Sequence, residues 1–127
     1  MDPRDLTDEV LDFLRERHLA TLTTLRADGS PHVVPVGFSF DADAVVARVI
    51  TFAGAVKARN ASRGGRAAVS QVDGGRWLTL EGTVRLVTDP DSIAVAVNGY
   101  AARYRQPKER ADRVALEIAV DKVMGRA

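Results

Sequence analysis

A lysine, an asparagine and an arginine recur at three-residue intervals directly after a predicted strand. They are Lys57, Asn60 and Arg63, and this spacing places their side chains on one side of a short helix. The helix follows a loop of small residues, 53–55, so its first backbone N–H groups are free to bind a phosphate. A lysine in the first turn opposes the helix dipole unless an anion lies nearby. A solvated basic helix covering one end of a sheet explains the same spacing equally well.

A second candidate is a strand face with little side-chain bulk. The run 32–40 alternates, with Val34, Val36, Phe38 and Phe40 on one face and Val33, Pro35, Gly37 and Ser39 on the other. Thin side chains let a flat ring lie against the backbone and use its N–H and C=O groups. An ordinary edge strand, protected from aggregation by its proline, accounts for the same residues without a ligand.

Trp77 is the only tryptophan and lies on the outward face of the predicted strand 77–87. A large aromatic side chain on a polar face indicates a ligand platform or a protein interface. The alternative is a tryptophan that partly covers the core at a turn. Arginine greatly outnumbers lysine, and arginine suits bidentate binding of carboxylate or phosphate. The arginines that surround the candidate segment, each also explained by solvation alone, are Arg48, Arg59, Arg63, Arg66 and Arg76.

Several classes of function are excluded by what the chain lacks. It has no cysteine, and its two histidines stand in no metal-ligand spacing, so no metal site is expected. It has no serine-based triad, no G-x-S-x-G elbow and no carboxylate pair, so a cofactor must carry any reaction. A net charge of +1 argues against nucleic-acid binding. With neither a membrane-spanning run nor a secretory signal, a cytoplasmic location is expected.

The 127 residues fit a single domain, 1–127, that is mainly β. Helices are predicted at 8–17, capped by Thr7, at 56–63 and at 90–104, the last weakened by Asn98-Gly99. Strands are predicted at 19–25, 32–40, 45–52, 67–72, 77–87 and 114–123. Six strands with short turns and few helices point to a small closed or half-closed antiparallel barrel.

The order of these segments resembles the pyridoxamine 5′-phosphate oxidase-like split β-barrel superfamily. The resemblance rests on residues 20–24, 28–38, 48–51, 57–60 and 77–82, and it covers essentially the whole chain. Within the superfamily the chain is most similar to the coenzyme F420 (deazaflavin)-dependent reductases of actinobacteria. Residues 70–74 and Tyr104-Arg105 resemble the biliverdin reductase group of that branch.

The resemblance implies a six-stranded antiparallel split β-barrel of the FMN-binding-protein type. It also implies a homodimer that binds its cofactor at the subunit interface. The residues expected to line the ring are Val34, Pro35, Val36 and Gly37, with Ile50 and Thr51 beside them. Lys57 is expected to hold the phosphate, with Asn60 and Arg63 as weaker candidates, and Trp77 is expected to approach from the partner subunit.

The implied activity is hydride transfer from reduced coenzyme F420 to a conjugated acceptor, with a biliverdin-type tetrapyrrole as the expected substrate. One alternative is an FMN-binding oxidase or reductase of the same fold. Another is a non-catalytic binder of a flavin, a deazaflavin or haem. Pyridoxamine phosphate oxidase activity itself is not expected, because the chain ends at Gly125-Arg126-Ala127 without that enzyme's C-terminal substrate-binding segment.

Overall fold

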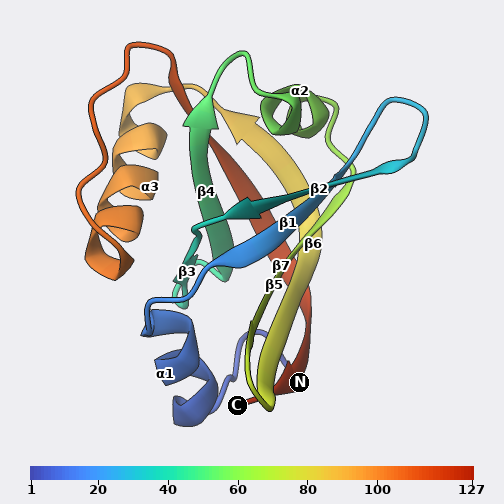
Figure 1. The fold of residues 1–127 in the computed structure, drawn as a ribbon, viewed down its shortest axis with the longest axis vertical. Helices are drawn as coiled ribbons and strands as arrows, with labels where there is room; N and C mark the ends of the chain where they lie inside the picture. Colours follow the sequence, from blue (N-terminus) through green and yellow to red (C-terminus); the bar gives the residue numbers. More distant parts are fainter.

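The computed structural model describes residues 1–127 as three helices and a seven-stranded antiparallel sheet. The helices are α1 (Asp8–Arg15), α2 (Val56–Ser62) and α3 (Pro90–Arg103). The strands are β1 (Ala20–Leu25), β2 (Pro31–Val36), β3 (Ser39–Asp41), β4 (Val46–Phe52), β5 (Arg66–Asp73), β6 (Arg76–Val87) and β7 (Arg113–Arg126). Figure 1 shows α1 and both chain termini at the lower end of the sheet, α2 at the upper end and α3 along one side.

The sheet has the strand order β2-β1-β5-β6-β7-β4-β3 and does not close. The predicted strand 32–40 divides into β2 and β3, which form the two edges of the sheet and are joined by Gly37 and Phe38. The ladder is interrupted because Phe38 uses its peptide groups elsewhere: its N–H donates to the Tyr104 hydroxyl, and its carbonyl accepts from Arg103. The prediction of a six-stranded barrel was therefore wrong in strand number and closure. The mainly β, antiparallel architecture with few helices is confirmed.

The inner face of the curved sheet holds one main apolar core of 19 buried residues. Alternation along each strand decides which side chains enter it. In β6, Leu78 and Leu80 are fully buried, whereas the Trp77 side chain points outward. In β2, Val36 is buried, whereas Pro35 is exposed on the opposite face. The predicted inward and outward faces of β6 are thus confirmed, and β2 shows the predicted alternation between its two faces.

Helix α1 closes one end of the core with Phe13 and Leu14. The predicted cap is confirmed, since the Thr7 hydroxyl accepts a hydrogen bond from the backbone N–H of Val10 at 3.3 Å. The helix ends at Arg15, two residues before its predicted end, because the next residue has an extended backbone.

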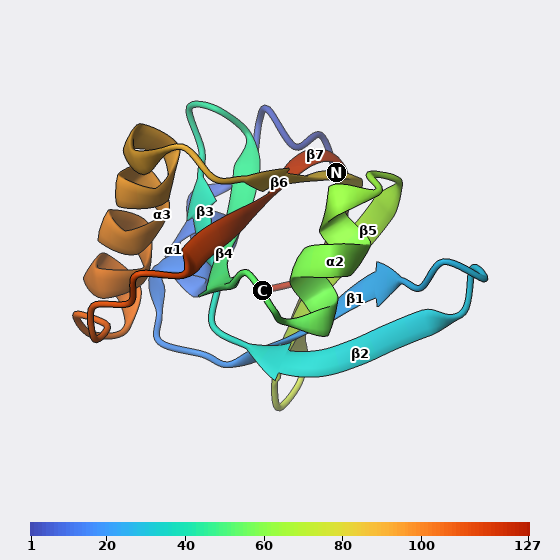
Figure 2. The same ribbon diagram turned by 90° about the horizontal axis from the view of Figure 1, so that it is seen from above.

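Helix α3 packs on the outer face of the sheet (Figure 2). Its Ala96 contacts Ala115 of β7 in a small buried cluster. The predicted weakness at 98–99 was wrong, because the helix continues through both residues. A Cβ on Gly99 would lie 2.5 Å from the Ser39 Oγ, so glycine is what allows α3 to approach β3 this closely. None of the three helices has the length and apolar character needed to cross a membrane.

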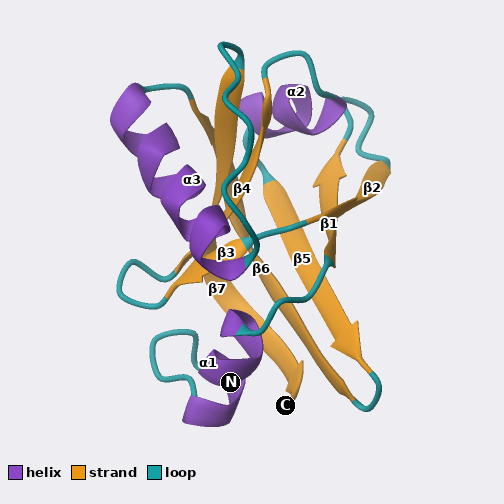
Figure 3. Cartoon of the chain, turned by 60° about the vertical axis from the view of Figure 1, so that its left-hand side comes forward, coloured by secondary structure: helices purple, strands orange, loops and turns teal.

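Strand β7 is an interior strand of the sheet, between β6 and β4, and extends beyond its predicted range of 114–123 at both ends (Figure 3). It pairs with β4 over seven residues on one side and with β6 on the other, with a register shift between Glu81 and Gly82. The first of these pairings sets Phe52, at the end of β4, opposite Arg113, at the start of β7.

Candidate functional site

A cavity of about 240 Å³ lies where the end of β2, strand β4, α2, α3 and the segment before β7 converge. It gathers half of the ten residues predicted to bind a cofactor, which come from three separate elements. The lining residues are Pro35, Val36, Gly37, Ile50, Lys57, Tyr100, Pro107 and Arg113. Two of them are cationic and none is acidic. The cavity is therefore suited to an anionic ligand with an apolar part.

Lys57 lies in the first turn of α2, which carries no acidic residue and no side-chain cap. Its ammonium group forms no ion pair, and partial burial lowers its pKa below the usual lysine value. Of the nine ion pairs in the structure, none involves this residue. Its charge is uncompensated within the protein, as a phosphate-binding lysine requires.

Arg113 is a cavity residue that the sequence analysis missed. Its guanidinium donates a hydrogen bond to the Lys108 carbonyl at 2.6 Å. The pairing of β4 with β7 sets Arg113 beside the chain that leads into α2 and Lys57. In the sequence, Arg113 stands directly before the last predicted strand. This position indicates a site residue only once it is known that the last strand pairs with the strand that leads into α2.

Gly37 has no side chain, but two aromatic rings, one on α3 and one at its C-cap, occupy the space above it. A Cβ at this position would lie 3.0 Å from ring carbons of both Tyr100 and Tyr104. The two rings lie 4.9 Å apart, centroid to centroid, and are tilted by 31°. Tyr104 packs α3 onto the sheet, whereas Tyr100 also lines the cavity.

Five of the ten predicted residues, Trp77 among them, do not line the cavity, and the other four belong to the fold. Val34 packs against the core and Thr51 is buried. Asn60 is buried and donates a hydrogen bond to the Thr24 hydroxyl at 3.0 Å. Arg63 donates to the Asn60 side-chain oxygen at 2.6 Å. The polar groups of Asn60 and Arg63 thus fasten α2 to β1.

Trp77 does not line the cavity within one subunit, but its side chain lies on the sheet face to which Pro35 belongs. The register links Pro35 to Thr21, Thr21 to Ser70, and Ser70 to Thr79, two residues along β6 from Trp77. About a third of the tryptophan remains exposed. Whether it approaches a cofactor from a partner subunit stays a prediction.

The arginines predicted to surround the pocket are mostly bound to groups of the protein itself. Arg48 pairs with Asp41 and Glu117, and Arg66 pairs with Asp121. The others donate as follows: Arg59 to the Gly54 carbonyl, Arg63 to the Leu25 carbonyl as well as to Asn60, and Arg76 to Glu16 and Asp73. These interactions leave no run of free guanidinium groups between residues 59 and 76.

Glu16, Asp73 and His18 come together in an exposed cluster whose ligand atoms lie within 4.8 Å of one another. The guanidinium of Arg76 pairs with both carboxylates, at 2.9 Å from Glu16 and 2.6 Å from Asp73. This pairing holds the pKa of Glu16 at about 2. The cluster is therefore a salt bridge that joins the α1 end to the β5–β6 turn.

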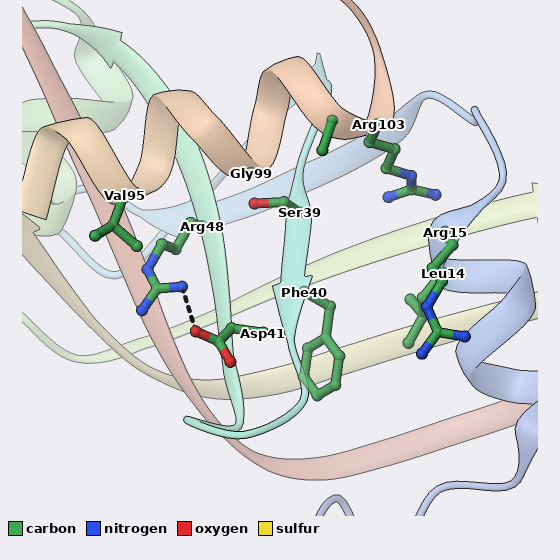
Figure 4. Close-up of a pocket in the computed structure, with 10 residues that line it drawn as sticks. Leu14, Arg15, Ser39, Phe40, Asp41, Arg48, Val95, Gly99 and Arg103 are labelled. Carbon is green, nitrogen blue, oxygen red and sulfur yellow. Dashed lines mark hydrogen bonds and ion pairs between the residues drawn. The ribbon is translucent and has the colours of Figure 1, made fainter.

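A larger cavity of about 450 Å³ lies on the other side of α3, against α1 and β3 (Figure 4). Figure 4 shows Arg48 paired with Asp41 there, and Arg103 near α1. The Arg103 guanidinium donates to the carbonyls of Glu16 and Phe38 and to Gln71. Because these charged groups already serve the fold, this cavity is a weaker ligand site than the one at Lys57.

A third cavity, of about 550 Å³, adjoins the first through Pro107 and Arg113, which line both. Its lining carries three cations, Lys108, Arg110 and Arg113, against one acidic residue, Glu109, and the guanidinium of Arg110 also pairs with Asp112 at 2.9 Å. The positive charge next to Lys57 thus comes from the segment between α3 and β7. The arginines expected there from the sequence, Arg48, Arg59, Arg63, Arg66 and Arg76, do not supply it.

Residues 6–126 match the family model described as pyridoxamine 5′-phosphate oxidase, and the chain therefore belongs to that family. One relative is the F420H(2)-dependent biliverdin reductase of Mycobacterium tuberculosis (strain CDC 1551 / Oshkosh). The two are 54% identical over 122 residues, which is 96% of this chain and 89% of the relative.

Solved structures support the same fold. A protein described as an F420 reductase is 26% identical, with a TM-score of 0.75, over 94% of this chain and 98% of that one. HutZ, the heme storage protein of Vibrio cholerae, is 16% identical with a TM-score of 0.77, over 94% of each chain. At that identity the second likeness shows the fold alone.

Proposed function

We propose that this protein is an oxidoreductase that uses reduced coenzyme F420 to reduce a biliverdin-type tetrapyrrole. The proposal rests on the similarity to one relative together with the lining of one cavity. A chain 54% identical to an F420H(2)-dependent biliverdin reductase has a cavity with two cations and no carboxylate where the predicted cofactor residues converge. The resemblance found in the sequence pointed to the same cofactor.

The donor set of the cavity fits this coenzyme. Lys57 and Arg113 suit its phosphate, since each is cationic and Lys57 has no carboxylate partner. Pro35 and Ile50 offer an apolar surface to a planar ring. When bound, the reduced deazaflavin supplies the hydride. The side chains of the protein orient the ring, hold the anionic tail and exclude water from one ring face.

The cation-rich cavity beside Arg113 is the place we assign to the acidic tail of the coenzyme. The lactyl-glutamyl tail of F420 extends beyond the phosphate, and it needs positive charge continuous with the phosphate site. Lys108 and Arg113, which form no ion pair within the protein, supply that charge. FMN has no such tail, so this cavity favours F420 over the FMN alternative.

We further propose that the protein is a homodimer. A cavity of about 240 Å³ is smaller than the roughly 300–1,000 Å³ of typical small-molecule pockets, so one subunit supplies only part of the site. The outward face of the β2-β1-β5-β6 half of the sheet carries no helix and exposes Val33, Val72 and Trp77. In a twofold dimer through this face, Trp77 of each subunit approaches the β2 wall of the other.

Reduced coenzyme F420 mixed with biliverdin and the purified protein tests the activity. We expect oxidation of the coenzyme to follow the loss of biliverdin in a one-to-one ratio, and to depend on the protein. Reduced FMN serves as the matched donor. Faster reduction by FMN would favour the FMN alternative, and binding of F420 without turnover would favour a carrier protein.

A further inference from the structure

The cavity contains one hydroxyl group that the fold does not use. Tyr100 lines the cavity beside Gly37, and its phenolic oxygen makes no hydrogen bond within the protein. The only buried side-chain polar atom without a partner is the Nδ1 of His32, so the Tyr100 hydroxyl is accessible. An accessible phenol on a cavity wall is free to bond to whatever occupies the cavity.

The neighbouring tyrosine has the opposite role. The Tyr104 hydroxyl donates to the His18 carbonyl at 2.5 Å and accepts from the Phe38 N–H at 3.2 Å. These bonds fix the Tyr104 ring, and the Tyr100 ring packs against it with 4.9 Å between the ring centroids. Both rings also rest against Gly37. The Tyr100 ring is therefore held in position although its hydroxyl is uncommitted.

The other polar side chains of the cavity differ from Tyr100 in kind. Lys57 and Arg113 are cationic and only donate hydrogen bonds, so they select an anion. Tyr100 is the one lining side chain that can both donate and accept, and the uncharged lining of the cavity is otherwise apolar, with Pro35, Ile50 and Pro107. An apolar wall suits a planar ring, whereas the two cations suit the phosphate, so we take the partner of the hydroxyl to be a ring atom.

We propose that Tyr100 is a ligand-binding residue whose ring packs against the edge of the bound planar ring and whose hydroxyl donates a hydrogen bond to a carbonyl oxygen of that ring. The inference rests on the proposed function, because it takes the ring to be that of the deazaflavin. It adds a contact from α3 to a site otherwise built from β2, β4, α2 and the chain that leads into β7.

Tyr100→Phe tests the inference because it removes only the hydroxyl. With no hydrogen bond lost inside the protein, the melting temperature without ligand is expected to stay unchanged. Affinity for oxidised F420 is expected to fall about five- to tenfold, the loss of one hydrogen bond. The absorption band of the bound coenzyme is expected to shift, since a donor to the ring carbonyl is lost.

Tyr104→Phe is the matched control, because it removes a hydroxyl that the fold does use. It is expected to lower the melting temperature of the free protein. If Tyr100→Phe binds F420 like the wild type with an unchanged spectrum, the inference is wrong. It is also wrong if this variant loses as much stability as Tyr104→Phe, because the role of Tyr100 is then structural.

If the proposed function itself is wrong, the result differs from a failure of the Tyr100 contact, because the wild-type protein would not bind F420. In that case the same pair of proteins is titrated with FMN, which also has a planar ring with carbonyl oxygens. Weaker FMN binding by Tyr100→Phe would support the contact with a ring. Equal FMN binding, or none by either protein, would overturn it.

Discussion

The phenolic oxygen of Tyr104 accepts a hydrogen bond from the backbone N–H of Phe38, 66 residues earlier in the chain, at 3.2 Å. This bond holds the segment that joins the two edges of the open sheet. Arg103, the preceding residue, donates to the carbonyl of the same Phe38 at 2.8 Å. The end of α3 thus fixes Gly37, and with it the cavity wall formed by the end of β2.

Gly37→Ala is expected to destabilise the protein by about 1–3 kcal/mol, because the added methyl group would lie 3.0 Å from both tyrosine rings. Displacement of the rings is also expected to weaken F420 binding. Urea denaturation and a coenzyme titration measure the two effects. Gly75→Ala is the control, since a Cβ there meets nothing within 4 Å. Equal stability of the two variants would contradict the close packing at Gly37.

Arg103→Met is expected to cost about 3 kcal/mol, because it removes the donor to two buried acceptors, the Phe38 carbonyl and the Gln71 side-chain oxygen, and to the part-buried Glu16 carbonyl. Equilibrium unfolding in urea measures the loss. The control is Arg105→Met, which removes an exposed arginine without a hydrogen bond. If the two substitutions cost the same, the Arg103 side chain does not hold the gap between β2 and β3.

In the alkaline range, the affinity for F420 is expected to fall as the pH rises. Burial lowers the pKa of Lys57 below 10.5 in the free protein, whereas a bound phosphate favours the charged form. Binding is therefore constant below the pKa of free Lys57 and weakens as the pH rises through it. A Lys57→Arg variant stays charged and should show a flat profile in the same titrations. Parallel profiles would place the titrating group elsewhere.

Several elements were predictable from local pattern alone. Alternation identified the buried faces of the strands, and the Thr7 cap located the start of α1. The break at Gly37 was not predictable, because it depends on hydrogen bonds from Arg103 and Tyr104, more than 60 residues away. Local pattern likewise does not show which arginines are free, since their carboxylate partners lie on other elements, as with Arg66 and Asp121.

Some residues of the candidate site could be predicted from the sequence, and others could not. Lys57, Gly37 and Pro35 stood out because each is unusual for its element. Arg113 and Tyr100 did not, because an arginine before a strand and a tyrosine on a helix are ordinary there. Only the pairing of β4 with β7 and the packing of α3 onto the sheet bring these two residues to the cavity.

Val72→Glu is expected to convert a wild-type dimer into a monomer and to weaken F420 binding. Val72 is 69% exposed on the uncovered sheet face beside Trp77, and a charge there cannot be buried at a twofold interface without cost. Sedimentation velocity measures the state of assembly. Val95→Glu on α3 places the same charge on another exposed valine and should leave the dimer intact. A monomeric wild type would contradict the proposed interface.

Titration of the wild-type protein and of Lys57→Ala with oxidised F420 and with FMN, followed by Trp77 fluorescence, tests the assigned site most directly. The wild type should bind F420 more tightly than FMN. Loss of the Lys57 charge should weaken F420 binding about tenfold or more with the fold intact, the size expected for a charged hydrogen bond. Equal F420 affinity of the two proteins would show that Lys57 does not belong to the site. Tighter binding of FMN than of F420 by the wild type would contradict the assignment of F420 as the cofactor.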